Sequence, residues 1–509
     1  MSGNQLKKGA ILSYVALIIG TVISLIYTPY MLRTLGQSQY GLFSLVNSTI
    51  AYLTILDFGF GNAIIRYTAK YRSEKNTQKE HMMQGMFLLI YVGIGIISFL
   101  LGLIFVFNVN GLFGKTLTPS ELQTARVLML LAVINISLAF PFSIFGSIIT
   151  AYEKFVFAQV IRILKLVLNP ILMVAILVLG YRAIGMIVVA TVLGIIFNIV
   201  NLVYCLKVLK IKAKFSGFDR PLLKEITIFS FYIFLNVVVD RVYWSTGQVM
   251  LGMLSGAVSI SIFAIAVQVN MYYMQISTAA SGVFLPRITA MHASGESSTR
   301  MSDAFIKVGR IQFAVIALAL SGFILFGRQF ITMWAGQNYT ESFSVAIWLM
   351  IPLSIPLIQN LGITILQAKN KHAFRSVVYL VIAIINILIS IPLIKKYGAL
   401  GAAMGTSVSL VAGQVIIMNF YYSYVIELNI KGFWTEIAKM TPAVLLAVGA
   451  ELLFARFVGG SGKFWFLINA VAFVGFYSIF MWLIGLNNYE KELVLAPIRN
   501  LSNRIKAKI

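Results

Sequence analysis

The sequence contains little that could carry redox, metal or hydrolytic chemistry. Cys205 is the only cysteine among 509 residues, which excludes disulfides within the chain and multi-cysteine metal sites. The three histidines, His81, His292 and His372, are scattered in or beside polar segments and suggest no metal centre. The motifs of zinc and serine hydrolases are absent as well. We therefore expect no enzyme activity, no cofactor and no metal.

Charged residues are also scarce. They make up 11% of the chain, against about 25% in ordinary soluble domains, whereas 59% of the residues are hydrophobic. This composition excludes a disordered chain, a coiled coil and a nucleic-acid-binding globule. The formal net charge is nevertheless +24, so a basic surplus in so apolar a chain needs its own explanation.

What the chain does contain is a series of apolar runs, each long enough to cross a bilayer. A crossing helix needs about 20 apolar residues, and these runs are too long and too uniformly apolar for barrel strands. We expect an all-α polytopic membrane protein with fourteen membrane helices, at roughly 10–33, 41–65, 84–107, 122–148, 156–179, 183–206, 224–252, 258–285, 308–333, 342–367, 375–394, 399–426, 437–456 and 464–485.

The basic residues give the chain an orientation. With the N-terminus inside, thirty of the forty basic residues fall in inner segments, nine in outer segments and one, Arg241, within a span. Cytoplasmic loops are enriched in Lys and Arg, so this bias places both termini in the cytoplasm. Most of the net charge is therefore a topology signal, and the inner face can meet anionic lipid headgroups.

Weak similarity between the two halves indicates an internal repeat at an offset of about 217–221 residues. Residues 151–157, AYEKFVF, correspond to 368–374, AKNKHAF, and Asn169 corresponds to Asn386. Six spans return the chain to its starting side, so the repeats are parallel. We expect two six-helix lobes around a central cavity, at 1–208 and 224–426. A basic cytoplasmic linker at 209–223 joins them, and 427–509 adds two helices and a basic tail.

Two ionisable residues, Asp240 and Arg241, lie near the middle of the seventh expected span. A charge at this depth costs about 2.5–3.5 kcal/mol on insertion scales, so it needs a reason. Arg241 shares a helix face with Ser245 and Gln248, which indicates a helix lining a wet cavity. A structural ion pair between helices is the alternative interpretation.

Other polar residues at helical spacing could line the same cavity. Gln268 and Tyr272 share a face of the eighth span, although such stripes also serve as contacts between helices. Asp57, toward the inner end of the second span, could hold an ion or proton or satisfy a helix end. Arg162 and Lys165, early in the fifth span, can extend to the inner surface and could still attract a phosphate.

Residues 27–67 resemble the opening of bacterial polysaccharide flippases, the polysaccharide-transporter branch of the multidrug/oligosaccharidyl-lipid/polysaccharide exporter superfamily. The AYEKF turn at 151–155 is also typical of the group. The resembling elements are Tyr27-Thr28-Pro29 with Arg33, Leu35-Gly36, Tyr40-Gly41-Leu42-Phe43 and Leu56-Asp57-Phe58-Gly59-Phe60-Gly61.

The resemblance implies a protein of the bacterial cytoplasmic membrane that moves an undecaprenyl-diphosphate-linked glycan from the inner to the outer leaflet by alternating access. In such proteins cationic cavity residues are thought to hold the diphosphate or acidic sugars. Arg241 matches that role by depth, and Arg33, Arg66 and Arg287 match it by residue type. Asp57 and Asp240 are candidates for ion or proton coupling. Candidate protein partners are a polysaccharide polymerase and glycosyltransferases.

Two other functions stay open at this stage. A cation-coupled drug exporter of the same superfamily would favour acidic residues in the first lobe, where Asp57 is the one well inside a span. A membrane-embedded glycan-processing enzyme would usually show a sizeable outer loop, whereas the longest expected here is 108–121.

Overall fold

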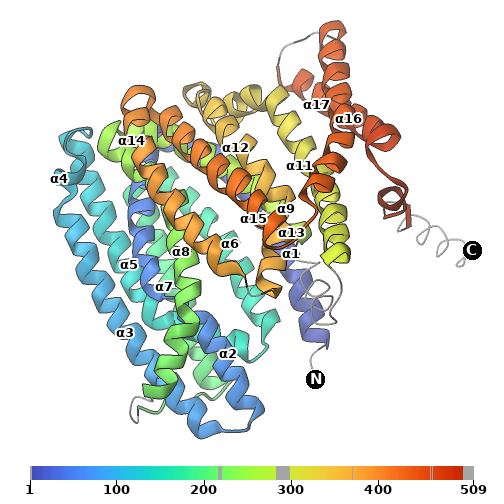
Figure 1. Ribbon diagram of the computed structural model, residues 1–509. Coiled ribbons are helices and arrows are strands. Elements are labelled where there is room, and N and C mark those ends of the chain that lie inside the picture. Colours follow the sequence, from blue (N-terminus) through green and yellow to red (C-terminus); the bar gives the residue numbers. More distant parts are fainter. Residues whose placement is uncertain are drawn as a thin grey trace, which may run out of the picture. The chain divides into compact units, whose positions relative to one another are not determined.

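The computed structural model describes residues 3–215, 220–281, 298–369, 371–458, 460, 462–493 and 495–496, and these residues are almost entirely helical (Figure 1). No strand occurs among them. Helices satisfy their own backbone hydrogen bonds, which an apolar layer requires of any segment that crosses it. The expected all-α class is confirmed.

The chain forms two compact units. The first comprises Met1–Ile265 and Tyr379–Gly405, and the second comprises Ala266–Val378 and Thr406–Ile509. The elements of the first unit are α1 (Gly3–Ala51), the 3₁₀ segment η1 (Tyr52–Asp57), α2 (Phe60–Ser73), α3 (Thr77–Phe107), α4 (Val109–Phe113), α5 (Pro119–Ala151), α6 (Phe155–Val178), α7 (Ala183–Lys207), α8 (Arg220–Leu254), the start of α9 (Ala257–Ser281) and the middle of α14 (His372–Leu410).

The second unit takes the remainder of α9 and both ends of α14. Its other elements are α11 (Ser298–Trp334), η2 (Gln337–Tyr339), α12 (Ser342–Ile358), α13 (Asn360–Ala368), the π-helical η3 (Val411–Ile417), α15 (Met418–Tyr424), α16 (Ile430–Phe457), α17 (Lys463–Phe480) and the π-helical η4 (Met481–Gly485).

Eleven stretches of the described chain are long and apolar enough to cross a membrane. Two of them, Lys8–Ser73 and Ala373–Tyr424, have 66 and 52 residues. At about 1.5 Å per residue both far exceed a hydrocarbon layer of about 30 Å, so each holds more than one pass. Gly36 (φ 75°) and Gly398 (φ 54°) interrupt these stretches. α8 is not among the eleven, and the count of fourteen stays a prediction.

The second expected span differs from the structure. We expected one helix over 41–65 that ends at Arg66, but the chain passes from α1 into the 3₁₀ segment η1 and then breaks. Phe58 (φ 50°) and Gly59 (φ 73°) are both left-handed, which stops the helix before α2 begins. α2 then continues to Ser73, so Arg66 lies within a helix.

Two stacked ring pairs support the internal repeat. In the first unit Phe157 of α6 stacks on Tyr204 of α7, with ring centroids 3.7 Å apart. In the second unit Phe374 of α14 stacks on Tyr421 of α15, with centroids 4.1 Å apart. Both members of the second pair lie 217 residues after their counterparts, which is the offset of the AYEKFVF match. The arrangement of the halves as two lobes stays a prediction.

A buried ion cluster in the second unit ties the segment after η4 to α11. The Arg310 guanidinium donates to both carboxylate oxygens of Glu490, at 2.6 and 2.9 Å, and to Glu436 at 3.0 Å. It also donates to the Gly485 carbonyl oxygen at 2.9 Å. Arg310 and Glu490 are each only 4% exposed, so neither charge could be left alone without a large penalty.

Replacing Arg310 with Met is expected to lower the free energy of unfolding by about 3–5 kcal/mol, because Glu490 is left buried without its counter-charge. Lys439→Met is the control, since Lys439 pairs with Glu436 from an exposed position and should change stability by less than about 1 kcal/mol. Thermal unfolding of both variants in detergent measures the difference. Equal destabilisation by the two substitutions would contradict the importance of the cluster.

Candidate functional site

The interrupted stretch between α1 and α2 is the first feature of the site. Its 3₁₀ turn and two successive left-handed residues lie within a long apolar stretch, toward the inner end of the second expected span. Non-helical backbone at membrane depth is tolerated where protein covers it or where it lines a cavity. Such discontinuous helices are a recurrent feature of transporter binding sites.

α8 runs alongside this interruption in the antiparallel direction. Phe234 of α8 stacks on Phe58, with centroids 4.8 Å apart, and Thr246 shares a hydrogen bond of 2.5 Å with the Tyr52 hydroxyl. Further along, the Gln248 side-chain oxygen accepts hydrogen bonds from Ser44 and Ser48 of α1, at 2.7 and 2.5 Å. Along α8 the contacting residues rise in number while their partners in η1 and α1 fall in number, so the two segments are antiparallel.

Arg241 lies on the α8 face that makes these contacts. It is seven residues from Phe234 and seven from Gln248, about two helical turns in each direction, so the three residues share a face. The Nε atom of Arg241 is buried and has no hydrogen-bond partner among the described residues. A buried donor without an acceptor is unfavourable, so this guanidinium is suited to an anionic ligand.

Asp57, the last residue of η1, is the acidic group of the interruption. It is half-buried, and one of its carboxylate oxygens accepts a hydrogen bond from the Tyr91 hydroxyl of α3 at 2.7 Å. The side chain therefore connects the end of η1 to α3, immediately before Phe58 adopts a left-handed backbone conformation. This contact gives Asp57 a structural role in the LDFGFG motif, and its role in ion or proton coupling stays a prediction.

A family model described as polysaccharide biosynthesis protein matches residues 6–292, which include the interruption and α8. The chain belongs to this family. A Shigella flexneri protein, provisionally named an O-antigen transporter, is 20% identical over 79% of this chain and 94% of its own length. A Haloferax volcanii protein, named a probable low-salt glycan biosynthesis flippase (Agl15), is 21% identical over 89% of this chain and 91% of its own.

Two solved structures of low sequence identity share the fold of this chain. The lipid II flippase MurJ in its inward closed conformation matches with a TM-score of 0.70 at 18% identity, covering 96% of this chain and 99% of that one. An inward-facing multidrug resistance transporter of the MATE family matches with a TM-score of 0.67 at 13% identity, covering 82% and 95%. The resemblance identified in the sequence is confirmed.

The other residues selected from the sequence have different surroundings. Arg33 and Arg66 are exposed, and the Arg66 guanidinium lies 5.8 Å from the ring centroid of Tyr67. In the second unit Gln268 donates to the Tyr272 hydroxyl at 2.8 Å. Arg287 lies outside the described residues. Asp240 is exposed. Their roles as binding or coupling residues stay predictions.

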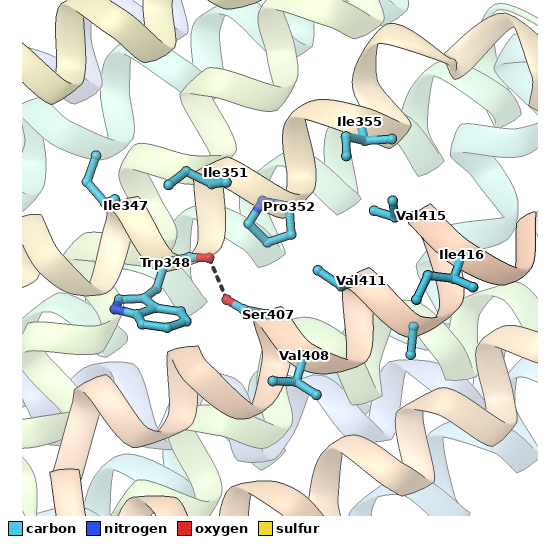
Figure 2. A pocket seen from close by; sticks show the side chains of 11 residues that line it. Ile347, Trp348, Ile351, Pro352, Ile355, Ser407, Val408, Val411, Val415 and Ile416 are labelled. Carbon is cyan, nitrogen blue, oxygen red and sulfur yellow. Dashed lines mark hydrogen bonds between the residues drawn. The ribbon is translucent and has the colours of Figure 1, made fainter. Parts of the chain in front are cut away.

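An apolar groove of about 600 Å³ in the second unit was not expected (Figure 2). It lies between α12 and η3. Pro352 has no N–H to offer the Trp348 carbonyl one turn earlier, and the Ser407 hydroxyl donates to that oxygen instead, at 2.5 Å. Pro352 is visible in the sequence, but the sequence does not show that Ser407 of another helix lies beside it.

A second cavity lies in the first unit between α1 and α6, and Arg162 and Lys165 are among its lining residues. From the sequence both cations appeared able to extend to the inner surface. Their spacing of one helical turn indicates from the sequence that the two side chains share a helix face. The sequence does not show that α1 forms the opposite wall of the cavity. In the described part of the chain no His, Cys, Asp and Glu side chains gather as a metal site would require.

Gln248→Leu tests whether this side chain is structural. We expect the free energy of unfolding to fall by about 1–3 kcal/mol, because the Ser44 and Ser48 hydroxyls lose their shared acceptor. Thr21→Val is the control, since the Thr21 hydroxyl donates only to the Leu17 carbonyl of its own helix. Chemical unfolding in detergent reports both changes, and an unaltered Gln248→Leu protein would contradict this role.

Proposed function

We propose that this protein is a flippase for an undecaprenyl-diphosphate-linked oligosaccharide, the repeat unit of a cell-surface polysaccharide. It moves the head group from the inner to the outer leaflet of the cytoplasmic membrane. Family membership and the names of the relatives favour this substrate class. Within the chain, the unpaired Arg241 Nε on the α8 face beside the interrupted helix carries the proposal.

The chemistry of the substrate explains why a cation is needed. A diphosphate cannot enter an apolar layer without compensation, because an uncompensated charge there costs many kcal/mol. A guanidinium offers paired N–H donors that match phosphate oxygens, and it stays protonated at all physiological pH values. The polyprenyl tail can remain in the bilayer while the head group crosses.

The proposed cycle is alternating access between two parallel lobes, 1–208 and 224–426, with the linker at 209–223 and both termini in the cytoplasm. The equal spacing of the two stacked ring pairs favours duplicated halves. The bias of basic residues toward one set of loops favours the orientation. The helices within 427–509 lie outside the repeat, and Asp57 and Asp240 are the proposed coupling groups.

Cation-coupled drug export is the competing function, and the similarity to a MATE-family fold together with Asp57 in the helix interruption favours it. Such a site binds cationic amphiphiles, so an unpaired Arg241 beside the interruption would repel its substrate. Transport of a cationic dye and of a polyprenyl diphosphate by the same vesicles separates the two functions.

Arg241→Ala is expected to reduce translocation of a fluorescent polyprenyl-diphosphate-linked hexose at least about tenfold, because a charged contact of more than about 1.4 kcal/mol is lost. The melting temperature should change little, since Nε has no partner to lose. Arg241→Lys should recover part of the rate, as it restores charge without the paired donors. Leaflet-specific quenching in reconstituted vesicles measures the transfer.

Arg182→Ala is the matched control, because Arg182 is an exposed cation of the same unit at the start of α7. It should transport at the wild-type rate. Wild-type transfer by Arg241→Ala would contradict the site assignment, whereas dye transport without diphosphate transport would contradict the proposed substrate.

A further inference from the structure

α1 and α6 form a parallel pair of helices with a constant register. Gly9 approaches Phe155, Gly20 approaches Leu166, and the Tyr27 hydroxyl lies 3.2 Å from the Met173 sulfur. Each pair is 146 residues apart, so the two helices run side by side over about five turns. Between Gly20 and Tyr27 on one wall, and Arg162 and Met173 on the other, they leave a cavity of about 360 Å³.

Three polar residues of α6 line this cavity at helical spacing. Arg162 and Lys165 are one turn apart, and neither forms an ion pair or hydrogen bond with another described residue. Asn169 follows one turn later, and its Oδ1 atom is buried without a hydrogen-bond partner. Ser24 and Tyr27 of α1 complete the polar part of the lining. The cavity thus offers two cations at one end and an unused acceptor at the other.

The corresponding helix of the second half carries different residues at the positions of the two cations. Counting on by 217 residues, Arg162 and Lys165 correspond to Tyr379 and Ile382, which are buried. Asn169 corresponds to Asn386, whose Oδ1 accepts a hydrogen bond of 2.9 Å from Ser390.

The residue of the first half that corresponds to Ser390 is Met173, whose side chain has no hydroxyl to donate. Asn169 therefore lacks the partner that Asn386 has. The two cations and the free acceptor are properties of the first half alone, and the duplicated fold does not require them.

We propose that the α1–α6 cavity binds a phosphoryl group joined to a hydroxylated head group. Arg162 and Lys165 bind the phosphoryl oxygens, and Asn169 Oδ1 accepts a hydrogen bond from a neighbouring hydroxyl. A phosphate dianion has no donor for Asn169, so the acceptor selects for the attached hydroxylated group. The assignment of that group to a glycan rests on the proposed function, whereas the phosphoryl site does not.

The positions of these residues along α6 fit a head group that enters the cavity from the expected inner side of the membrane. Arg162 lies seven residues into α6 and Asn169 fourteen, about 10 and 21 Å from its first residue. The cations are thus nearer the end of the helix that we expect at the inner surface, and the acceptor is deeper. A glycan would be recognised further in than its phosphate.

The test is direct binding to the full-length protein in phosphatidylcholine nanodiscs, with farnesyl diphosphate as the probe. The double variant Arg162→Gln/Lys165→Gln should weaken binding at least about tenfold, because both charged contacts are lost. Lys207→Gln/Lys210→Gln is the matched control: it removes the same charge from exposed positions of the same unit and should change affinity by less than about twofold.

Asn169→Leu separates the second part of the site from the first. Farnesyl diphosphate should bind this variant as it binds the wild type, within about threefold, because the cations remain. The wild type should bind a farnesyl-diphosphate-linked hexose more tightly than farnesyl diphosphate. Asn169→Leu should bind the two ligands with equal affinity, since one hydrogen bond to the sugar is gone. A retained advantage in Asn169→Leu would overturn the role of this residue.

Titration with phosphatidylglycerol identifies the source of the phosphoryl group. Displacement of the probe by phosphatidylglycerol at comparable affinity supports the phosphoryl site and assigns it to a membrane lipid headgroup; failure to displace supports the linked glycan. Unchanged binding by the double variant overturns the proposal. Translocation plays no part in this assay, so loss of transport in Arg241→Ala and loss of binding here are separate outcomes.

Discussion

The structure depends on one constraint: in an apolar layer every backbone hydrogen bond must be made within the protein. The apolar runs are helical for that reason, and at two departures from the helix other parts of the protein supply contacts. Ser407 donates to the Trp348 carbonyl that Pro352 leaves free. At the interruption before α2, contacts from Tyr91 and from α8 hold the chain where its own helix cannot. At these irregular segments, side-chain contacts from other helices therefore stabilise the backbone conformation.

Two arginines differ in how the protein satisfies their guanidinium groups. Arg310 is surrounded by two carboxylates and a carbonyl oxygen, so its charge is fully used by the protein and its role is structural. Arg241 has a buried Nε for which no described residue provides an acceptor. An unmatched buried donor is unfavourable, so an anionic ligand that accepts from Nε would relieve this penalty. This difference in hydrogen-bond partners is the reason that we propose Arg241, and not Arg310, as a substrate-binding cation.

Much of this could be predicted from the sequence, because hydrophobic periodicity and the distribution of Lys and Arg depend only on local order along the chain. The helical class and the repeat offset follow from such patterns, whereas the membrane depth of Arg241 stays a prediction. The break at Phe58 could not be predicted, since it needs the α3 and α8 contacts that hold it. For the same reason the contacts of Gln248 could not be predicted: two serines of α1 donate to its side-chain oxygen, and its role in substrate binding stays a prediction. The spacing of residues along the sequence predicts which of them share a helix face. It does not predict which residues of another helix pack against that face.

Duplication explains how the two halves can share a fold and still differ in chemistry. At the repeat offset of 221 residues that relates Gly41 to Ile262, Ser24 corresponds to Ser245, and Gly20 corresponds to Arg241. In the first half the small residue Gly20 leaves room beside α6, and the cations Arg162 and Lys165 come from that facing helix. In the second half the cation stands on the first helix itself, and the positions that match Arg162 and Lys165 are Tyr379 and Ile382. Positive charge therefore lies beside the Gly20 position in the first half, supplied by α6, and on the equivalent position of the second half, supplied by Arg241 of α8. The duplicated fold can therefore carry positive charge on a different helix in each half, because the fold constrains the helices and not the charge on each one.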